Sequence, residues 1–158
     1  MQKKKHTESL QEFLEHKKIE LGNPKIKRVD WEKRKTEWIK AVHSLYDKVD
    51  EIIVKNFRNA GYKVTGEKEE IRIVEDYVGP YNVPNYILKV DKFKIYFSPI
   101  GTIWVGFKGR VDMTLPKGTV ELILTDNNVW KILEGFTVSV DPIDFNEENI
   151  MKVFRDYL

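Results

Sequence analysis

Cysteine is absent from this sequence of 158 residues. Its absence excludes disulfide bonds, thiolate metal ligands and thiol nucleophiles, and it fits a reducing compartment such as the cytoplasm. Histidine is scarce, since only His6, His16 and His43 occur and none stands at the spacing of a zinc site such as HExxH. A serine in a GxSxG turn is also missing. We therefore predict no metal site and no cofactor.

Long apolar runs are missing as well. No run approaches the roughly 18 apolar residues that a membrane span requires. The basic start MQKKKH is not followed by the apolar segment of a secretory signal peptide. We therefore expect a cytoplasmic protein without a membrane partner.

The composition is that of a folded chain with a highly charged surface. Hydrophobic residues make up 41%, which is enough for a core, and charged residues make up 33%, above the usual quarter. The net charge of +2 is unevenly distributed. Residues 1–40 hold 12 of the 27 Lys and Arg residues against 7 of the 25 Asp and Glu residues, a local net of +5, which leaves −3 for the rest. The basic character therefore belongs to the N-terminal part.

Two regions are predicted, a basic helical arm with its connector over residues 1–29 and a single domain over residues 30–158. In the arm, Ser9 and Glu12 form a predicted capping box ahead of helically spaced Leu10, Phe13 and Leu14. The run Gly-Asn-Pro at residues 22–24 ends that helix, because glycine turns readily and proline cannot continue it.

A long amphipathic helix is predicted over residues 30–60, with Asp30 as its N-cap and Gly61 as its stop. Its apolar residues follow one another at steps of three, four and seven: Trp31, Trp38, Val42, Leu45, Val49, Ile52, Ile53 and Phe57. Such a stripe occupies one face of a helix. We expect the stripe to pack on the protein's own sheet; a coiled-coil dimer is the alternative, which two tryptophans in the seam fit poorly.

An antiparallel sheet is predicted over residues 62–140, because short β-branched and aromatic segments alternate with turns too short for crossover helices. The expected strands are Tyr62–Thr65, Glu70–Glu75, Tyr86–Val90, Phe93–Ser98, Ile103–Phe107, Arg110–Leu115, Thr119–Thr125, Val129–Leu133 and Phe136–Val140. A closing helix over residues 145–157 follows, with Asp144 and Glu147 as its capping box. The predicted fold class is α+β: an antiparallel sheet packed by a long helix, with an N-terminal helical arm and a C-terminal helix.

The segment GFKGRVDMTLPKGTVE contains the one candidate catalytic group, Arg110, Asp112 and Glu121. Two acids on adjacent strands resemble part of the PD-(D/E)xK nuclease signature, which binds Mg²⁺ through carboxylate oxygens. The sequence departs from that pattern, since Ile123 stands where the signature has lysine. The alternative is a surface cross-strand ion pair, with a glycine bulge at Gly118 that keeps the two acids out of direct register.

Two candidate binding segments remain. The stretch DYVGPYNVPNY is predicted to be an irregular loop that carries Tyr77, Tyr81 and Tyr86 for partner contact, or else one whose tyrosines fold back on the sheet. The basic connector and helix start supply six candidate phosphate ligands beside two tryptophans: Lys25, Lys27, Arg28, Lys33, Arg34 and Lys35. A solvated helix face with inward-facing tryptophans is the competing interpretation.

The run GRVDM, followed by a strand pair, WKI and a short terminal helix, resembles a pattern in small uncharacterised bacterial proteins. The resemblance covers the C-terminal third, from Gly109 onward. It implies no activity and assigns no functional residue.

These observations favour a binding protein over an enzyme. We predict an intracellular protein-binding module of the immunity, accessory or regulatory type, whose partner is another protein. The first alternative is a nucleic-acid-binding protein that uses the basic segment from Lys25 to Lys40, and the second is a Mg²⁺-dependent nuclease with Asp112 and Glu121.

Overall fold

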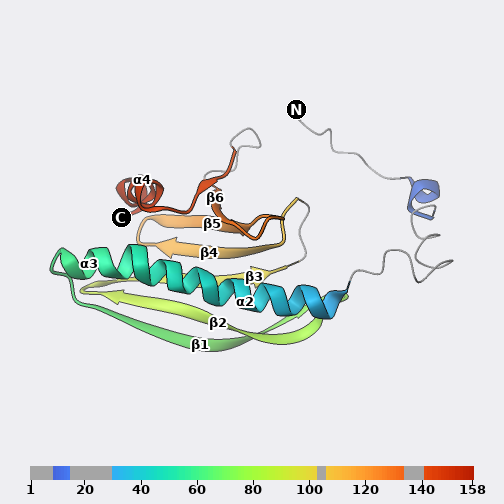
Figure 1. Cartoon of the computed structure of the whole chain (residues 1–158), viewed down its shortest axis with the longest axis horizontal. Helices are drawn as coiled ribbons and strands as arrows, with labels where there is room; N and C mark the ends of the chain where they lie inside the picture. Colours follow the sequence, from blue (N-terminus) through green and yellow to red (C-terminus); the bar gives the residue numbers. More distant parts are fainter. Residues whose placement is uncertain (1–8, 15–29, 103–105, 134–140) are drawn as a thin grey trace.

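The computed structural model describes residues 9–14, 30–102, 106–133 and 141–158. It contains one antiparallel sheet of seven strands, whose spatial order is the same as their order in the chain (Figure 1). The strands are β1 Val64–Glu75, β2 Gly79–Val90, β3 Phe93–Gly101, β4 Gly109–Leu115, β5 Gly118–Leu124, β6 Trp130–Leu133 and β7 Ile143–Asp144. With the long helix and the C-terminal helix, this sheet confirms the predicted α+β class.

The long helix runs from Trp31 to Asn59 as three consecutive segments, α2 Trp31–Val49, the π-helix η1 Asp50–Val54 and α3 Lys55–Asn59. As predicted, Asp30 caps it by accepting a hydrogen bond from the Lys33 N–H at 3.0 Å. Gly61 follows its end at a φ of 94°, a conformation that glycine adopts readily.

The π-helical segment is explained by the spacing of the apolar stripe. From Leu45 onward the stripe advances by four residues at a time, to Val49, Ile53 and Phe57. In an α-helix each such step rotates the face by roughly 40° beyond a full turn. A wider π turn absorbs that excess, and all four side chains are buried. The predicted packing of the stripe on the protein's own sheet is therefore confirmed.

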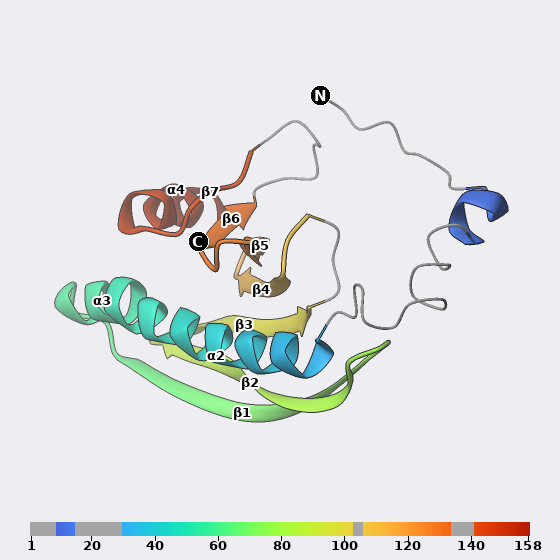
Figure 2. The ribbon, with the colours of Figure 1, turned by 45° about the vertical axis from the view of Figure 1, so that its right-hand side comes forward.

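The first two strands curve around the long helix. β2 pairs with β1 along its whole length, but its register with β3 runs only from Tyr86 to Val90. The residue at position 84 is a proline, which has no N–H to offer to β3. The Tyr46 hydroxyl lies at this point and donates to Pro84 O at 2.6 Å, with Phe97 O at 3.5 Å. The β1–β2 hairpin thus separates from β3 and bends beneath α2 (Figure 2).

Several sequence-based boundaries are corrected by the structure. The segments Tyr62–Thr65 and Glu70–Glu75 are not two separate strands. Val64, Thr65 and all of Glu70–Glu75 belong to the single strand β1, whereas Tyr62 and Lys63 precede it. The predicted strand Phe136–Val140, and residues 103–105 of Ile103–Phe107, lie outside the described residues, and the described residues 106–107 are not strand. In the N-terminal arm the predicted capping box is confirmed, since the Glu12 N–H donates to Ser9 Oγ at 3.1 Å and the Ser9 N–H donates to Glu12 Oε1 at 3.2 Å.

The closing helix α4, Glu147–Tyr157, starts two residues later than predicted and has a different cap. Asn146 accepts the Asn149 N–H at 2.9 Å, whereas Asp144 lies in β7 beside Lys131. Ile150 and Val153 are buried against the long helix and the sheet, and Phe154 stacks on Phe57 with ring centroids 5.6 Å apart.

Candidate functional site

The three residues proposed as a catalytic group do come together on the β4–β5 hairpin. Leu115 pairs with Gly118, so the loop has two residues and the expected bulge at Gly118 is absent. Asp112 therefore lies directly opposite Glu121, and the bulge prediction was wrong. The physical reason is that Pro116 and Lys117 alone close the turn, which leaves no extra residue to shift the register.

Arg110 contacts both acids of this pair and offsets one of their two charges. Its Nε lies 2.7 Å from Asp112 Oδ1 and its Nη2 lies 3.1 Å from Asp112 Oδ2, a bidentate contact, while Glu121 Oε2 is 3.7 Å away. The hydrogen bond that the guanidinium donates to Asp112 raises the pKa of Arg110. A divalent cation needs several converging oxygens, and the described residues contain no group of three or more His, Cys, Asp or Glu side chains that could hold one. The arrangement is an ion-pair cluster on the sheet.

Most of the predicted tyrosine loop is a strand, and only residues 76–78, which include Tyr77, form a turn. Residues 79–90 form β2, and the side chains of Tyr81 and Tyr86 are buried. Trp38 Nε1 donates to the Tyr81 hydroxyl at 3.1 Å, and that hydroxyl donates to Glu75. Burial raises the pKa of both tyrosines. The expectation of an irregular loop was wrong because both prolines of this segment fit into an antiparallel pair. Only Tyr77 of the three is exposed, at 71%.

Where the basic segment is described, some of its side chains bond other residues of the protein. Lys25, Lys27 and Arg28 lie outside the described residues. Lys35 pairs with Glu32 at 2.9 Å, while Lys33 is exposed. Trp38 is 1% exposed, which confirms the inward-facing interpretation for this tryptophan.

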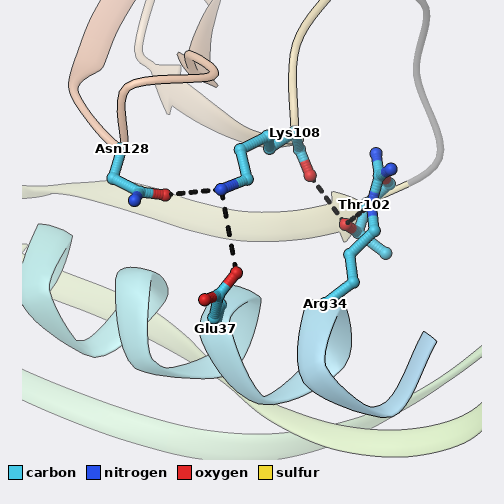
Figure 3. A network of polar contacts seen from close by, with 5 residues as sticks. All are labelled: Arg34, Glu37, Thr102, Lys108 and Asn128. Carbon is cyan, nitrogen blue, oxygen red and sulfur yellow. Dashed lines mark hydrogen bonds and ion pairs between the residues drawn. The ribbon is translucent and has the colours of Figure 1, made fainter. Parts of the chain in front are cut away.

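A polar network joins the start of α2 to the loops at one end of the sheet (Figure 3). Thr102, which is fully buried, is at its centre. Arg34 donates from Nε to Thr102 Oγ1 at 3.2 Å and from Nη2 to Thr102 O at 2.5 Å. The Thr102 hydroxyl in turn donates to Lys108 O at 2.6 Å, and Lys108 Nζ reaches Asn128 Oδ1 at 2.9 Å. Because its groups bond one another, the network holds the loops in place.

Sequence reasoning missed Thr102, although one signal was available. Gly101, the last residue of β3, directly precedes Thr102, and a glycine in a strand often marks a place where another group comes close to the backbone. A Cβ at position 101 would lie 2.8 Å from Glu75 Oε1, and that same carboxylate oxygen accepts the Thr102 N–H at 2.8 Å. The glycine thus lets a carboxylate from β1 reach the buried end of β3.

A different candidate site is the edge of the sheet formed by β1, the first strand in the sheet order. The Asp91 N–H donates to Lys63 O at 3.0 Å, one position beyond the Val64–Val90 pair. Since hydrogen-bonded pairs alternate along an antiparallel ladder, the odd-numbered residues of β1 bond β2. The even-numbered residues direct their N–H and C=O groups to the open edge.

Two contacts support this assignment of the open edge. Pro80 and Pro84 of β2 lie opposite Val74 and Glu70, which are even-numbered positions where β2 needs no N–H for β1. Val64 O, the first outward carbonyl, accepts a hydrogen bond from Arg58 Nη2 at 3.0 Å. Among the described residues no strand pairs with this side of β1, so the open part of the edge runs from Gly66 through Lys68, Glu70 and Arg72 to Val74.

A hollow of about 440 Å³ lies beside the start of this edge, between β1 and the end of the long helix. It is lined by Asp50, Val54, Lys55, Arg58, Asn59, Gly66 and Tyr86. The hollow can accept a polar or charged side chain, because its lining supplies both signs of charge.

Comparison of the chain with protein-family models, with curated proteins and with solved structures found no match. No helix of the described residues is both long enough and apolar enough to cross a membrane. The bacterial resemblance of the C-terminal third stays a prediction, and function has to be argued from the geometry of the site.

Proposed function

We propose that this protein is a binding module that recognises an extended segment of another protein by adding it as a further strand to β1. The observation that carries the proposal is the length and position of β1, a strand of 12 residues at the border of the sheet. Main-chain hydrogen bonds to such an edge supply affinity, and pockets for alternate side chains supply specificity. The residues from Gly66 to Val74 offer the main-chain hydrogen-bonding groups, and the hollow at Gly66 offers a pocket for a partner side chain.

The charges of β1 favour a selective partner. The strand carries four glutamates and two basic residues. Charged side chains on an edge strand suppress pairing with arbitrary chains. A partner strand can pair with β1 when its side chains carry charges opposite to Lys68 and the neighbouring glutamates, because opposite charges directly across a strand pair are favourable. The net negative charge of β1 favours a partner segment with basic residues.

The test is a proline at an outward-facing position. Glu70→Pro removes an N–H that points to the open edge, while the bonds from β1 to β2 at the odd positions stay. Glu70→Ala makes the same change of charge but keeps the N–H, so it is the matched control. Peptides selected from a library of extended sequences against the intact protein are titrated against all three proteins. Circular dichroism and urea midpoints check that the variants fold.

The proposal expects binding to the parent and to Glu70→Ala, and at least a tenfold loss with Glu70→Pro. Hydrogen exchange with bound peptide should protect the amides of Lys68, Glu70 and Arg72 beyond those of the neighbouring odd positions. A selected peptide that binds a folded Glu70→Pro protein as tightly as the parent, without protecting these amides, would exclude β1 as the binding edge.

A further inference from the structure

A surface rich in lysine and exposed aromatic rings surrounds the β2–β3 turn. We call it the hairpin surface, and it consists of Tyr62, Lys63, Lys89, Lys92, Phe93, Lys94 and Tyr96. Val90 pairs with Phe93, so Asp91 and Lys92 form the turn, with Asp91 at a φ of 46°. The hairpin surface is separate from the open edge of β1, and the inference drawn from it does not rest on the proposed function.

Two lysines of the hairpin surface face each other directly. Lys89 and Lys94 are cross-strand partners in the β2–β3 ladder, and both are exposed. Like charges at directly opposed positions destabilise a sheet. Within the described residues, the ion pairs involve other lysines, at positions 35, 108 and 131. The pair at 89 and 94 therefore retains a concentrated positive charge, which an anion between the two ammonium groups would neutralise.

Exposed rings and hollows flank these charges. Tyr62 is 43% exposed and Tyr96 is 39% exposed. A hollow of about 680 Å³ includes Tyr62, Lys63 and Lys89, and a second of about 360 Å³ includes Lys94 and Tyr96. Both hollows include Lys92 and Phe93, so they meet at the turn. Among the described residues that line them, Asp91 is the one acid, and its carboxylate accepts the Lys63 N–H at 3.0 Å.

We propose that the hairpin surface binds single-stranded nucleic acid. Lysines neutralise phosphates along a strand, and aromatic side chains stack on unpaired bases. Two hollows with an exposed tyrosine in each suit the unpaired bases of a single strand, which are free to turn outward and stack on the rings. In a duplex the bases stay paired and stacked inside the helix. The surface also differs from the basic segment predicted from the sequence, in which Arg34 is bonded to Thr102.

The charge part of the proposal is tested with fluorescent oligo(dT) and oligo(U) of 20 nucleotides, by anisotropy over a range of salt concentrations. The double variant Lys89→Gln/Lys94→Gln is compared with Lys48→Gln/Lys152→Gln, which removes the same charge from exposed positions on the helices. We expect the first variant to weaken binding at least tenfold and to reduce the salt slope by about 0.7 for each lost phosphate contact. We expect the second to bind like the parent. Equal effects of the two variants would overturn the proposal.

The stacking part is tested at Tyr96. Tyr96→Ala is expected to lower affinity between about fivefold and a hundredfold, the range for losing one stacked base, and Tyr96→Phe should restore it. A duplex of the same sequence should bind more weakly than the single strand. If Tyr96→Ala binds like the parent, if the duplex binds as well, or if anionic vesicles and not oligonucleotides require Lys89 and Lys94, the single-strand assignment is wrong. Absence of any oligonucleotide binding at low salt would also overturn it.

Discussion

At the scale of single residues, buried hydroxyl groups define how the sheet bends. The Tyr46 hydroxyl donates to Pro84 O at the position where β2 leaves β3, and so supplies a donor to a carbonyl that lies beyond the β2–β3 pairing. Thr102, which directly follows β3, plays a comparable part, because its one side chain both accepts from Arg34 and donates to Lys108 O. In both places a side chain forms a hydrogen bond with a backbone group where a strand pairing ends. A buried backbone carbonyl or amide requires such a partner.

Tyr46 gives a prediction about alkaline pH. Burial raises its pKa above the value of about 10 that it has in the unfolded chain. Because the folded state holds the proton more tightly, the stabilisation from this group is complete below pH 10 and is lost as the pH rises above it. The free energy of unfolding should then fall by up to about 1.4 kcal/mol per pH unit for this one group.

The measurement is urea denaturation between pH 8 and pH 11 for the parent and Tyr46→Phe. At pH 8 the variant should be less stable by about 1–3 kcal/mol, because it leaves Pro84 O without its donor. Above pH 10 the two curves should converge, since phenylalanine has no proton to lose. Parallel curves over the whole range would show that Tyr46 does not govern the alkaline transition.

At the scale of elements, the N-cap of α4 is Asn146 in place of the predicted Asp144. Asn146 makes the capping hydrogen bond, and Asp144 makes an exposed ion pair with Lys131 at 3.1 Å. Asn146→Ala should therefore cost about 1 kcal/mol. Asp144→Ala should cost less than about 0.5 kcal/mol, since exposed ion pairs contribute little. Thermal and urea unfolding measure both, and an equal cost would contradict the cap assignment.

The elements were predictable where one pattern dominated. The stripe from Trp38 to Phe57 repeats often enough to specify a helix and its buried face. The β4–β5 pair could also be predicted, and it brings Asp112 and Glu121 together. Pro80 and Pro84 concealed the first half of β2, because a proline in a strand usually indicates a loop. They are tolerated because they lie opposite the even-numbered, non-bonded positions of β1.

Candidate sites were less predictable than the elements, because they depend on which strands are neighbours. For Tyr81 and Tyr86 the sequence left two alternatives, partner contact at the surface or packing back on the protein, and the structure shows both buried toward the long helix. Lys89 and Lys94 are separated by a turn in the sequence and become direct partners only once the register is known. The open edge of β1 is likewise a property of strand order, which the hydrophobic pattern of one strand does not specify.

At the scale of the whole molecule, the long helix is held at both ends and in between, by the sheet, by the loop after β3 and by α4. Near its start Arg34 bonds Thr102, and Trp38 bonds Tyr81. In the middle Ala41 O accepts from Trp130 Nε1 at 3.0 Å. Phe57 packs on α4 at the far end. These contacts come from the loop after β3, from β2, from β6 and from α4, so the helix connects distant parts of a sheet whose own strands are joined only to their neighbours in the chain.

This arrangement predicts that loss of the contact between Arg34 and Thr102 destabilises only the start of the long helix. Thr102→Val keeps the volume of the side chain but removes the acceptor of Arg34 Nε and the donor to Lys108 O. We expect a loss of about 1–3 kcal/mol in the free energy of unfolding, because buried polar groups lose their partners. Hydrogen exchange should accelerate in the first turns of α2 and stay unchanged around Phe57.

Thr114→Val is the control, since the Thr114 hydroxyl forms a hydrogen bond with the exposed hydroxyl of Thr119. We expect this variant to change the free energy of unfolding by no more than about 0.5 kcal/mol. Uniformly faster exchange along the helix would mean instead that the helix opens as one unit, and that the network of Figure 3 contributes global rather than local stability.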